Sequence, residues 1–416
     1  MKRIFYGWWI VLATNLICLL GFGTWLYSFG VFFKPMMNEF GWTRAMTAGA
    51  ASLRSIEGGV AGPVVGWAVD KYGARRVIIF GGIVSGLGFA LMPFVDSLLG
   101  FYLAYGIIVS IGMSAMLYLP AFTVIAKWFR RRLSRALAVL AVGAGLGGLV
   151  CAPAATLVIQ HFGWRIAFLG MGILMWLVVI PLAMVVRERP EDMGLRPDGD
   201  PPEGAPGAGG SEGVPAAGGS ADYTLKQALA SSAFWVIALT FFFSSLSHSV
   251  VFVHAIPALT DAGISAELAA FSVGLLTVVS IAGRLSFGYL GDFVDKRYLF
   301  LIGYTLQGAG VLILMIAREM TTVYLFVAVF GVGFGSTVPL LASIRADYFG
   351  RAALGKIQGF MSPVTMVAGA TGPVSAGYLF DTTGSYQTAF LAVGLLTIAG
   401  GFIILLAKPL PGAAAA

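Results

Sequence analysis

One charged stretch, GWAVDKYGARR at residues 66–76, lies between two long apolar runs. A shorter version, GYLGD at residues 288–292, returns 222 positions later and is followed by Lys296 and Arg297. Further landmarks return at offsets of 220 and 221, namely Trp128-Phe129 as Tyr348-Phe349 and Gly163-Trp164 as Gly384-Ser385. A nearly constant offset over separated landmarks indicates a duplicated unit.

The composition excludes a water-soluble protein. Of the 416 residues, 58% are hydrophobic and 11% are charged. A soluble domain could not cover its surface with so few charges, so a lipid bilayer must be the surrounding solvent. The apolar runs continue over roughly 20 residues, whereas the strands of a membrane barrel alternate in polarity over about 10. The membrane spans are therefore predicted to be helices.

Charged and turn-forming residues divide the chain into twelve predicted spans. These cover residues 6–33, 44–69, 75–94, 98–125, 136–160, 165–186, 232–258, 267–291, 298–317, 321–344, 357–380 and 386–408. With a cytoplasmic N-terminus, 20 of the 26 basic residues fall on the cytoplasmic side, and the outer loops keep Lys34, Arg44, Arg165 and Arg318. The positive-inside rule thus predicts a multi-pass protein of the inner or plasma membrane with both termini cytoplasmic.

A segment rich in Pro, Gly and Ser separates the two copies. It cannot bury apolar area and favours a flexible cytoplasmic linker. We predict an all-α membrane protein of twelve transmembrane helices in two six-helix pseudo-symmetric halves, with an N-terminal domain at 1–186, a linker at 187–231 and a C-terminal domain at 232–416. Within the linker, Thr224 and Gln227 form the predicted capping box of a short helix at the membrane surface.

The charged loop at residues 66–76 resembles the signature loop of the major facilitator superfamily, and its second copy lies where that family places it. The stretch WFRRRLSRALA at 128–138, followed by GAGLG at 143–147, resembles the monocarboxylate transporters and the oxalate/formate antiporters. The resemblance implies the major facilitator fold. Two positions depart from the animal monocarboxylate transporters, which carry an aspartate where this chain has Ser280 and a lysine where it has Tyr27.

Arg284 is predicted to lie at bilayer depth, where an ionised side chain costs about 2.5–3.5 kcal/mol on insertion scales. Its planar guanidinium can hold a carboxylate through two parallel hydrogen bonds, which a lysine cannot do. We therefore predict that Arg284 binds a carboxylate substrate. The alternative is an ion pair with Glu57 or bonds to backbone carbonyls.

Arg54 and Glu57 lie on one face of the second span, three residues apart. They form either a local salt bridge or a proton-loading site, since burial raises and the neighbouring cation lowers the pKa of a glutamate. His254 is a third proton-coupling candidate, with His248 beside it on the seventh span. Both histidines can instead be hydrogen-bonded packing or gating residues near the outer mouth.

The resemblance further implies that the first, fourth and tenth spans line the substrate cavity. Tyr27, Tyr118 and Phe334 lie on these spans, and Ser280 lies one turn before Arg284. Tyrosine hydroxyls can bond a carboxylate or a hydroxyl group, and an aromatic face can enclose a short alkyl chain. Plain packing is the alternative for each aromatic residue.

The two copies of the charged loop are predicted to form a cytoplasmic gate. Its residues are Asp70, Arg75, Arg76, Asp292, Lys296 and Arg297. A carboxylate there can meet a helix N-terminus or a basic side chain of the opposite half when the inner side closes. The alternative, plain positive-inside topology, explains the arginines but not the matched aspartates.

The predicted function is secondary active transport of a small organic anion, such as lactate or pyruvate, by proton symport with rocker-type alternating access. Anion exchange of the oxalate/formate type and efflux of hydrophobic compounds are the alternatives within transporters, and a receptor without turnover is another. An enzyme is not expected, because the sequence places no nucleophile near a base and has no cluster of metal-ligating residues.

Cys18 and Cys151 lie in apolar runs and are expected to be packing residues. We expect no cofactor, metal or nucleic acid, and a monomer in the bilayer.

Overall fold

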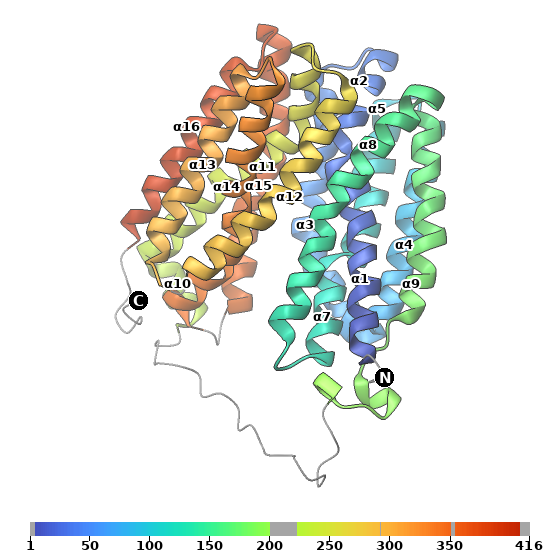
Figure 1. Cartoon of the computed structure of the whole chain (residues 1–416), viewed down its shortest axis with the longest axis vertical. Coiled ribbons are helices and arrows are strands. Elements are labelled where there is room, and N and C mark those ends of the chain that lie inside the picture. The colour runs from blue at the N-terminus through green and yellow to red at the C-terminus, as the bar shows by residue number, and fades with distance from the viewer. Residues whose placement is uncertain (1–4, 200–222, 292, 351–353, 408–416) are drawn as a thin grey trace. The chain divides into compact units, whose positions relative to one another are not determined.

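The computed structural model describes residues 5–199, 223–291, 293–350 and 354–407, and every regular element in these ranges is a helix (Figure 1). The α-helices are α1 Tyr6–Phe22, α2 Phe29–Phe40, α3 Arg44–Tyr72, α4 Ala74–Leu91, α5 Leu98–Phe101, α6 Ser110–Met116, α7 Tyr118–Trp128, α8 Leu133–Leu174, α9 Ile180–Val185, α10 Leu225–Ala230, α11 Ser232–Asp261, α12 Ala266–Leu290, α13 Lys296–Ile316, α14 Met320–Phe349, α15 Leu354–Thr383 and α16 Gln387–Ile403. Turns of π-helix lie at Gly23–Tyr27, Tyr102–Val109 and Met175–Val179, and turns of 3-10 helix lie at Met92–Phe94, Pro190–Met193, Pro197–Gly199 and Ile404–Leu406.

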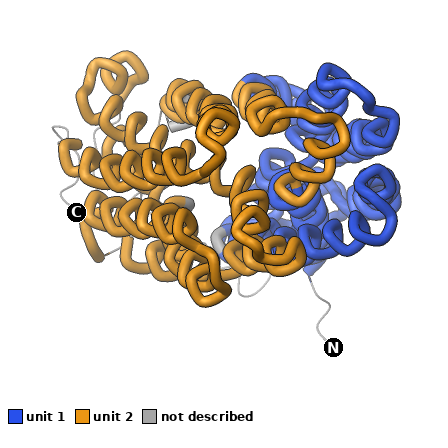
Figure 2. Tube along the Cα trace, turned by 90° about the horizontal axis from the view of Figure 1, so that it is seen from above, with its two compact units in different colours: residues 1–28, 60–215 blue, residues 29–59, 216–416 orange. Residues whose placement is uncertain are grey.

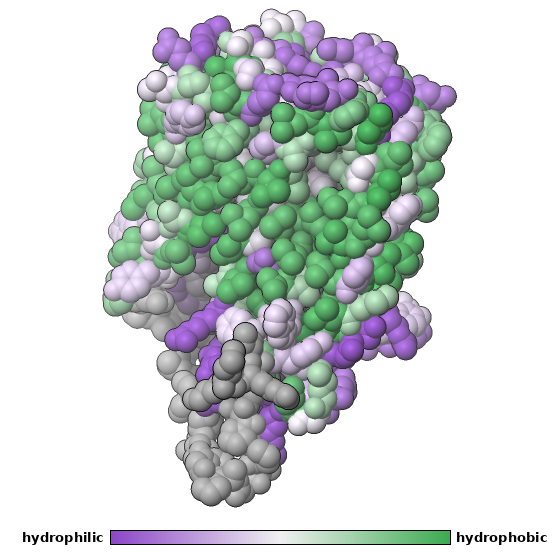
Figure 3. Space-filling view, turned by 45° about the vertical axis from the view of Figure 1, so that its right-hand side comes forward, coloured by the Kyte–Doolittle hydropathy of each residue, from purple (hydrophilic) through white to green (hydrophobic). Residues whose placement is uncertain are grey.

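The helices overlap the predicted spans. Within the described ranges, nine helical stretches are long and apolar enough to cross a membrane, and the number of twelve crossings stays a prediction. One predicted boundary, at residues 160–165, lies inside α8, which breaks at Gly163 with a φ of 83°. Apolar side chains cover the middle of the visible face, and hydrophilic ones gather at its two ends (Figure 3). Cys18 and Cys151 are buried and free, as expected.

The chain forms two compact units that do not follow chain order (Figure 2). Unit 1 comprises Met1–Ser28 and Val60–Pro215, and unit 2 comprises Phe29–Gly59 and Ala216–Ala416. Unit 2 therefore holds α2 and the first half of α3 together with α10 to α16. The division into domains at residues 1–186 and 232–416 stays a prediction.

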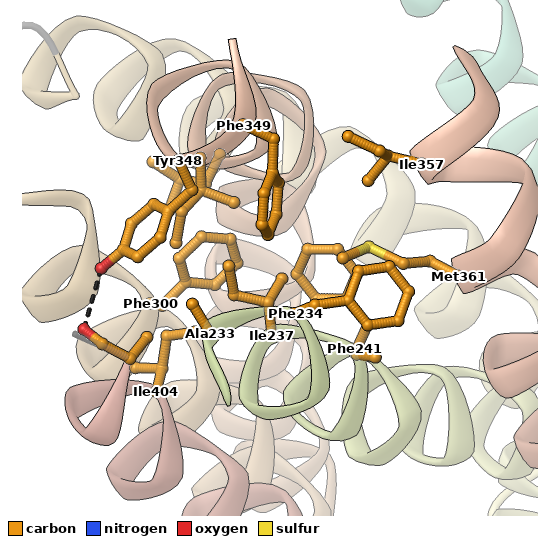
Figure 4. Close-up of a cluster of buried hydrophobic side chains, with 14 of the residues drawn as sticks. Ala233, Phe234, Ile237, Phe241, Phe300, Tyr348, Phe349, Ile357, Met361 and Ile404 are labelled. Carbon is orange, nitrogen blue, oxygen red and sulfur yellow. Dashed lines mark hydrogen bonds between the residues drawn. The ribbon is translucent and has the colours of Figure 1, made fainter. Parts of the chain in front are cut away.

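Matching hydrogen bonds within the two units support the predicted duplication. In unit 1 the indole of Trp128 donates to the carbonyl of Arg187 at 2.9 Å. In unit 2 the hydroxyl of Tyr348 donates to the carbonyl of Ala407 at 3.0 Å, inside a buried apolar cluster that includes Phe349 (Figure 4). Both donors and both acceptors are 220 positions apart. In each unit an aromatic side chain thus donates a hydrogen bond to a backbone carbonyl just after a helix end, after α9 in unit 1 and after the 3-10 turn that follows α16 in unit 2.

Left-handed glycines recur at the same spacing. Gly41 and Gly263 have φ values of 67° and 93° and are 222 positions apart. Gly163 and Gly384 have φ values of 83° and 71° and are 221 positions apart. A side chain with a Cβ is strained in this conformation, so glycine is the residue of choice at these helix breaks.

The described ends of the predicted linker are ordered. Thr224 and Gln227 form the predicted capping box at the start of α10, which confirms that local prediction. At the other end, Asp198 is buried, and its carboxylate accepts the backbone N–H groups of Arg130 and Arg131 at 2.9 and 2.8 Å. The residues between, 200–222, lie outside the described ranges.

An ionic network joins the start of α3 to the C-terminal helices of unit 2. The buried guanidinium of Arg44 lies 2.6 Å from a carboxylate oxygen of Asp261 and donates to the hydroxyl of Tyr386 at 2.7 Å. It also lies 3.5 Å from the ring centroid of Phe380, within the range of a cation–π contact. Lys34 of α2 pairs with the second oxygen of Asp261 at 2.6 Å. By the predicted topology this network lies on the outer side.

His254 extends this network into the interior of unit 2. The hydroxyl of Tyr386 donates to His254 Nδ1 at 3.0 Å, and Nε2 donates to the carbonyl of Pro373 at 2.8 Å. The neutral tautomer with a proton on Nε2 satisfies every one of these bonds. His254 is fully buried and packs edge to face against Phe33 of α2.

Close contact with α14 positions the turn of α12 that carries Arg284. A Cβ at Gly335 would lie 2.0 Å from the carbonyl oxygen of Ser280 and 3.0 Å from the backbone nitrogen of Arg284. A Cβ at Gly283 would lie 2.2 Å from the carbonyl oxygen of Val332. Since backbone atoms cannot move aside cheaply, glycine is needed on both helices where they cross.

Replacement of Asp381 by Asn should destabilise the protein. The carboxylate of Asp381 accepts the backbone N–H groups of Arg44 and Ala45, both at 2.9 Å, and caps the start of α3. An amide keeps one acceptor and loses the charge, and a lost cap costs about 1 kcal/mol. We expect a lower Tm in detergent for Asp381→Asn and an unchanged Tm for the exposed control Asp96→Asn. Identical melting of the two variants would contradict the capping role.

Replacement of Gly335 by Ala should force α12 and α14 apart. Overpacking of this kind costs about 1–3 kcal/mol. The matched control is Gly359→Ala on α15, where a Cβ meets nothing within 4 Å. Thermal melting in detergent should show a lower Tm for Gly335→Ala than for Gly359→Ala, and a Gly335→Ala variant as stable as wild type would show that the crossing tolerates a Cβ.

Candidate functional site

Arg284 is the candidate anchor of the site. It lies on α12 six residues before the end of the helix, and the charged residues of α12 are Glu267 in its first turn and Arg284. At 1.5 Å per residue, Arg284 lies about 9 Å from the last residue of the helix. The side chain is partly buried. Such a position gives a guanidinium a low-dielectric surrounding, in which an anion is bound more strongly than in water.

Ser280 and Phe334 lie on the two helices that cross beside Arg284. Ser280 is buried, and its hydroxyl donates to the carbonyl of Thr277 at 2.6 Å, so in this arrangement it offers no proton to a substrate. The ring of Phe334 meets His248 edge to face, with 4.7 Å between the ring centroids, and contacts Phe252 at 5.2 Å. Phe334 therefore forms part of an aromatic surface between α14 and α11.

His248 belongs to a polar chain inside unit 2. Its Nε2 lies 3.4 Å from the hydroxyl of Ser244, which donates to the side-chain oxygen of Gln307 at 3.2 Å. The amide nitrogen of Gln307 donates to the carbonyl of Gly333 at 2.9 Å. Because the single hydroxyl proton of Ser244 is donated to Gln307, Ser244 accepts its other hydrogen bond from His248. The proton of the neutral imidazole is therefore on Nε2, and Nδ1 is left as an acceptor. His248 is thus hydrogen-bonded, as expected, but it belongs to this inner chain of bonds, whereas His254 belongs to the network of Arg44.

The two charges of α3 that are predicted to lie at membrane depth belong to the same unit as Arg284, although they precede it by more than 200 positions. Arg54 is buried, with its guanidinium carbon 5.9 Å from the ring centroid of Phe29, and Glu57 is half-buried. The helix that carries them packs on α15, since Ser55 would contact a Cβ at Gly369 at 2.8 Å. Their role in proton coupling stays a prediction.

Tyr27 and Tyr118 lie in unit 1. Tyr27 is buried in the π-helical turn after α1, and Tyr118 begins α7, is 49% exposed and stacks on Phe122 with 6.2 Å between ring centroids. Of the two, Tyr118 is the exposed side chain. Their role in substrate binding stays a prediction.

The first copy of the predicted gate surrounds a glutamate that sequence reasoning missed. Glu188 accepts the backbone N–H of Arg75 at 2.8 Å at the start of α4, and its second oxygen lies 3.8 Å from Lys127. Asp70 and Arg76 are exposed on the same side of unit 1. An acidic residue at a helix N-terminus is stabilised by the helix dipole.

The basic residues in the second copy of the predicted gate form ion pairs with aspartates of unit 2. Lys296 pairs with Asp347 of α14. Arg297 donates to both oxygens of Asp295, its shortest bond being 2.6 Å, and these hydrogen bonds lower the pKa of that carboxyl below its usual value. Asp292 lies outside the described residues. A gating role for both copies stays a prediction.

Sequence reasoning also missed the network around Arg44. Its members come from α2, α3, α11, α15 and the residue before α16, and no short motif links them. One feature of the sequence does point to this network. Lys34 and Arg44 are two of the four basic residues in the predicted outer loops, although the positive-inside rule favours basic residues on the cytoplasmic side. Basic residues on the outer side are expected to pair with acidic residues there. Asp261 and Asp381 also lie at outer helix ends in the predicted topology.

Proteins of similar sequence include several monocarboxylate transporters. The chain is 27% identical over 404 residues to monocarboxylate transporter 13 of Bos taurus, covering 96% of this chain and 89% of that protein. It is 28% identical over 410 residues to monocarboxylate transporter 12 of Xenopus laevis, covering 97% and 89%. It is also 28% identical over 417 residues to monocarboxylate transporter 11 of Homo sapiens, covering 98% and 84%.

Solved structures of similar fold include a bacterial homologue of the human lysosomal transporter Spinster, in an inward-facing and occupied conformation. The TM-score is 0.70 at 15% sequence identity, and the match covers 98% of this chain and 96% of that one. The family model of the Major Facilitator Superfamily matches residues 13–292 and 237–415. Because these two matches together take in nearly the whole chain, this protein belongs to the major facilitator superfamily, whose members are helical membrane transporters.

Proposed function

We propose that this transporter carries a small organic anion, a monocarboxylate such as lactate or pyruvate, by proton symport. The observation that carries the proposal is Arg284, a partly buried guanidinium on an otherwise uncharged stretch of α12. A carboxylate supplies the opposite charge and the two acceptor atoms that a guanidinium fork fits. The names of the similar proteins agree with this substrate class.

The surroundings of α12 suit a short carboxylic acid. Phe334 and Phe252 present aromatic faces between α14 and α11, and such faces can enclose an alkyl chain of a few carbons. Tyr27 and Tyr118 are proposed to contribute from the N-terminal half, and Ser280 to accept a hydrogen bond from a substrate hydroxyl. Ligand sites of this kind combine apolar walls with a few polar groups that fix orientation.

Energetics favour coupling to a proton. Inward movement of a monoanion against an inside-negative potential costs about 2.3 kcal/mol per 100 mV, and one co-transported proton removes this cost. Glu57, with Arg54 beside it, and His254 are the proposed proton carriers. Protonation of His254 would disturb its bond from Tyr386, which is itself bonded to Arg44. Proton loading at His254 would therefore loosen the network on the predicted outer side.

Alternating access is proposed to follow the duplication, with six-helix halves at residues 1–186 and 232–416 rocking about a midplane site and the linker at 187–231 joining them. Opening on the outer side then requires α2 and the start of α3 to leave α11 and α15, which breaks the contacts of Arg44 with Asp261 and Asp381. The charged loops at Asp70 and Lys296 close the cytoplasmic side. The protein is proposed to act as a monomer in the inner or plasma membrane with cytoplasmic termini.

Replacement of Arg284 by Lys should strongly impair carboxylate transport. A lysine keeps the positive charge but cannot form the two parallel hydrogen bonds of a guanidinium. A charge-assisted hydrogen bond contributes about 1.5–3 kcal/mol. Because each 1.36 kcal/mol is a factor of ten in rate, kcat/KM should fall at least about tenfold. The assay is uptake of lactate, pyruvate, oxalate and formate into proteoliposomes, with and without an inward proton gradient. The matched control is Arg318→Lys, an exposed arginine of unit 2, which should transport as wild type does.

Three results would contradict the proposal. Failure of wild type to carry any of the four anions would remove the substrate class. An Arg284→Lys variant as active as wild type would remove the role of the guanidinium fork. Uptake that is driven by an anion inside the vesicles and is insensitive to the proton gradient would favour exchange.

A further inference from the structure

A polar cavity lies within unit 2, and one of its lining residues, His248, contacts Phe334 of the proposed substrate site. It has a volume of about 300 Å³, and α11, α13, α14 and α15 contribute its walls. Its polar lining consists of Arg345, His248, Tyr304, Gln358, Thr365 and three serines, Ser244, Ser245 and Ser362. Arg284 is not among the lining residues. The volume matches the lower end of the range for small-molecule sites, about 300–1,000 Å³.

Arg345 gives the cavity its charge. It lies on α14 four residues before the end of the helix, is partly buried, and has its guanidinium carbon 5.8 Å from the ring centroid of Phe241. Among the residues that the structure describes, no carboxylate forms an ion pair with it. The nearest acid along the helix, Asp347, pairs with Lys296. The cavity therefore has a cationic wall whose charge these side chains leave uncompensated.

The hydrogen-bonding groups of the cavity are mostly committed to the protein. Ser245 donates to the carbonyl of Thr365 at 3.0 Å, and Ser362 donates to the carbonyl of Gln358 at 2.9 Å. The amide side chain of Gln358 is exposed in this lining. The donors that remain for a ligand are thus the guanidinium of Arg345, the amide of Gln358 and the buried hydroxyl of Tyr304, which together suit the acceptor oxygens of a carboxylate.

The rest of the lining is apolar. Phe241 and Met361 are buried side chains of the hydrophobic cluster in Figure 4, and Leu341 packs against that cluster. A fully hydrated inorganic ion gains little from such walls, whereas a short carbon chain is removed from water by them. The combination of one guanidinium, one amide, one phenolic hydroxyl and three apolar side chains is typical of a site for a small organic acid.

We propose that this cavity is a second carboxylate site, at which the anion docks between the site of Arg284 and the predicted cytoplasmic side. Its place follows from Arg345, near the end of α14 that the predicted topology makes cytoplasmic. The proposal rests on the proposed function for its substrate class, and its chemistry can be tested without transport.

Charge-selective labelling of a thiol in the cavity tests the cation. In Ser362→Cys, the rate of reaction with an anionic methanethiosulfonate reagent is compared with that of its cationic analogue, and the native thiols Cys18 and Cys151 are buried. Arg345 should favour the anionic reagent, and Arg345→Gln should lower the ratio of the two rates about fivefold or more, since charges a few ångströms apart interact strongly near a protein surface. Arg318→Gln is the matched control and should leave the ratio unchanged. An equal ratio with and without Arg345 would overturn the proposal.

Protection by pyruvate tests the ligand in the same variants. Millimolar pyruvate should slow labelling of Ser362→Cys severalfold and should not slow it when Arg345 is Gln. Arg345→Lys should keep the charge preference and lose most of the protection, which also excludes misfolding as the cause. Labelling that pyruvate does not slow in any variant would overturn the site.

A transport measurement separates this inference from the proposed function. In vesicles of fixed orientation, Arg345→Gln should raise the KM for pyruvate presented at the cytoplasmic face about fivefold and leave the KM at the outer face within twofold. Equal KM changes at both faces would contradict a cytoplasmic docking site. Failure of wild type to carry any carboxylate would remove the proposed function and leave the labelling result to decide the cavity.

Discussion

An arginine held away from water needs opposite charge, hydrogen-bond acceptors or an aromatic face, and this requirement accounts for much of the arrangement of unit 2. Arg44 meets it completely, with the carboxylate of Asp261, the hydroxyl of Tyr386 and the ring of Phe380. Removing one member of such a set leaves a buried charge uncompensated, which is costly. Arg44 is thus suited to hold helices together. Arg345, in a cavity whose described walls bring no carboxylate to it, is suited to take its counter-ion from solution.

The network of Arg44 is one of the contacts that make the compact units differ from the order of the chain. Phe29–Gly59 belongs to the N-terminal half in sequence and to unit 2 in its contacts. The carboxylates that hold it, Asp261 and Asp381, lie at the ends of α11 and α15. A transporter that alternates between two open states must be able to break such contacts, and ion pairs with partners in several helices are broken together or not at all.

Sequence reasoning predicted the parts of the fold that depend on local patterns. Apolar length located the helices, the duplication appears again in the bonds of Trp128 and Tyr348, and the capping box at Thr224 is present. The partners of Arg44 could not be predicted, because Asp381 is 337 positions away and depends on packing. Arg345 is one of the 20 basic residues that the positive-inside rule assigns to the cytoplasmic side, and a cation near a cytoplasmic helix end has the same appearance in sequence whether it faces water or a cavity.

The central claim, that a proton accompanies a carboxylate, is tested most directly by the pH inside proteoliposomes. Pyruvate is added outside vesicles that contain wild-type protein and a trapped fluorescent pH indicator, with the membrane potential clamped at different values. The account predicts acidification of the lumen that requires the protein, has one proton per pyruvate and proceeds at a rate independent of potential. Pyruvate entry without acidification, or at a rate that follows the potential, would contradict it.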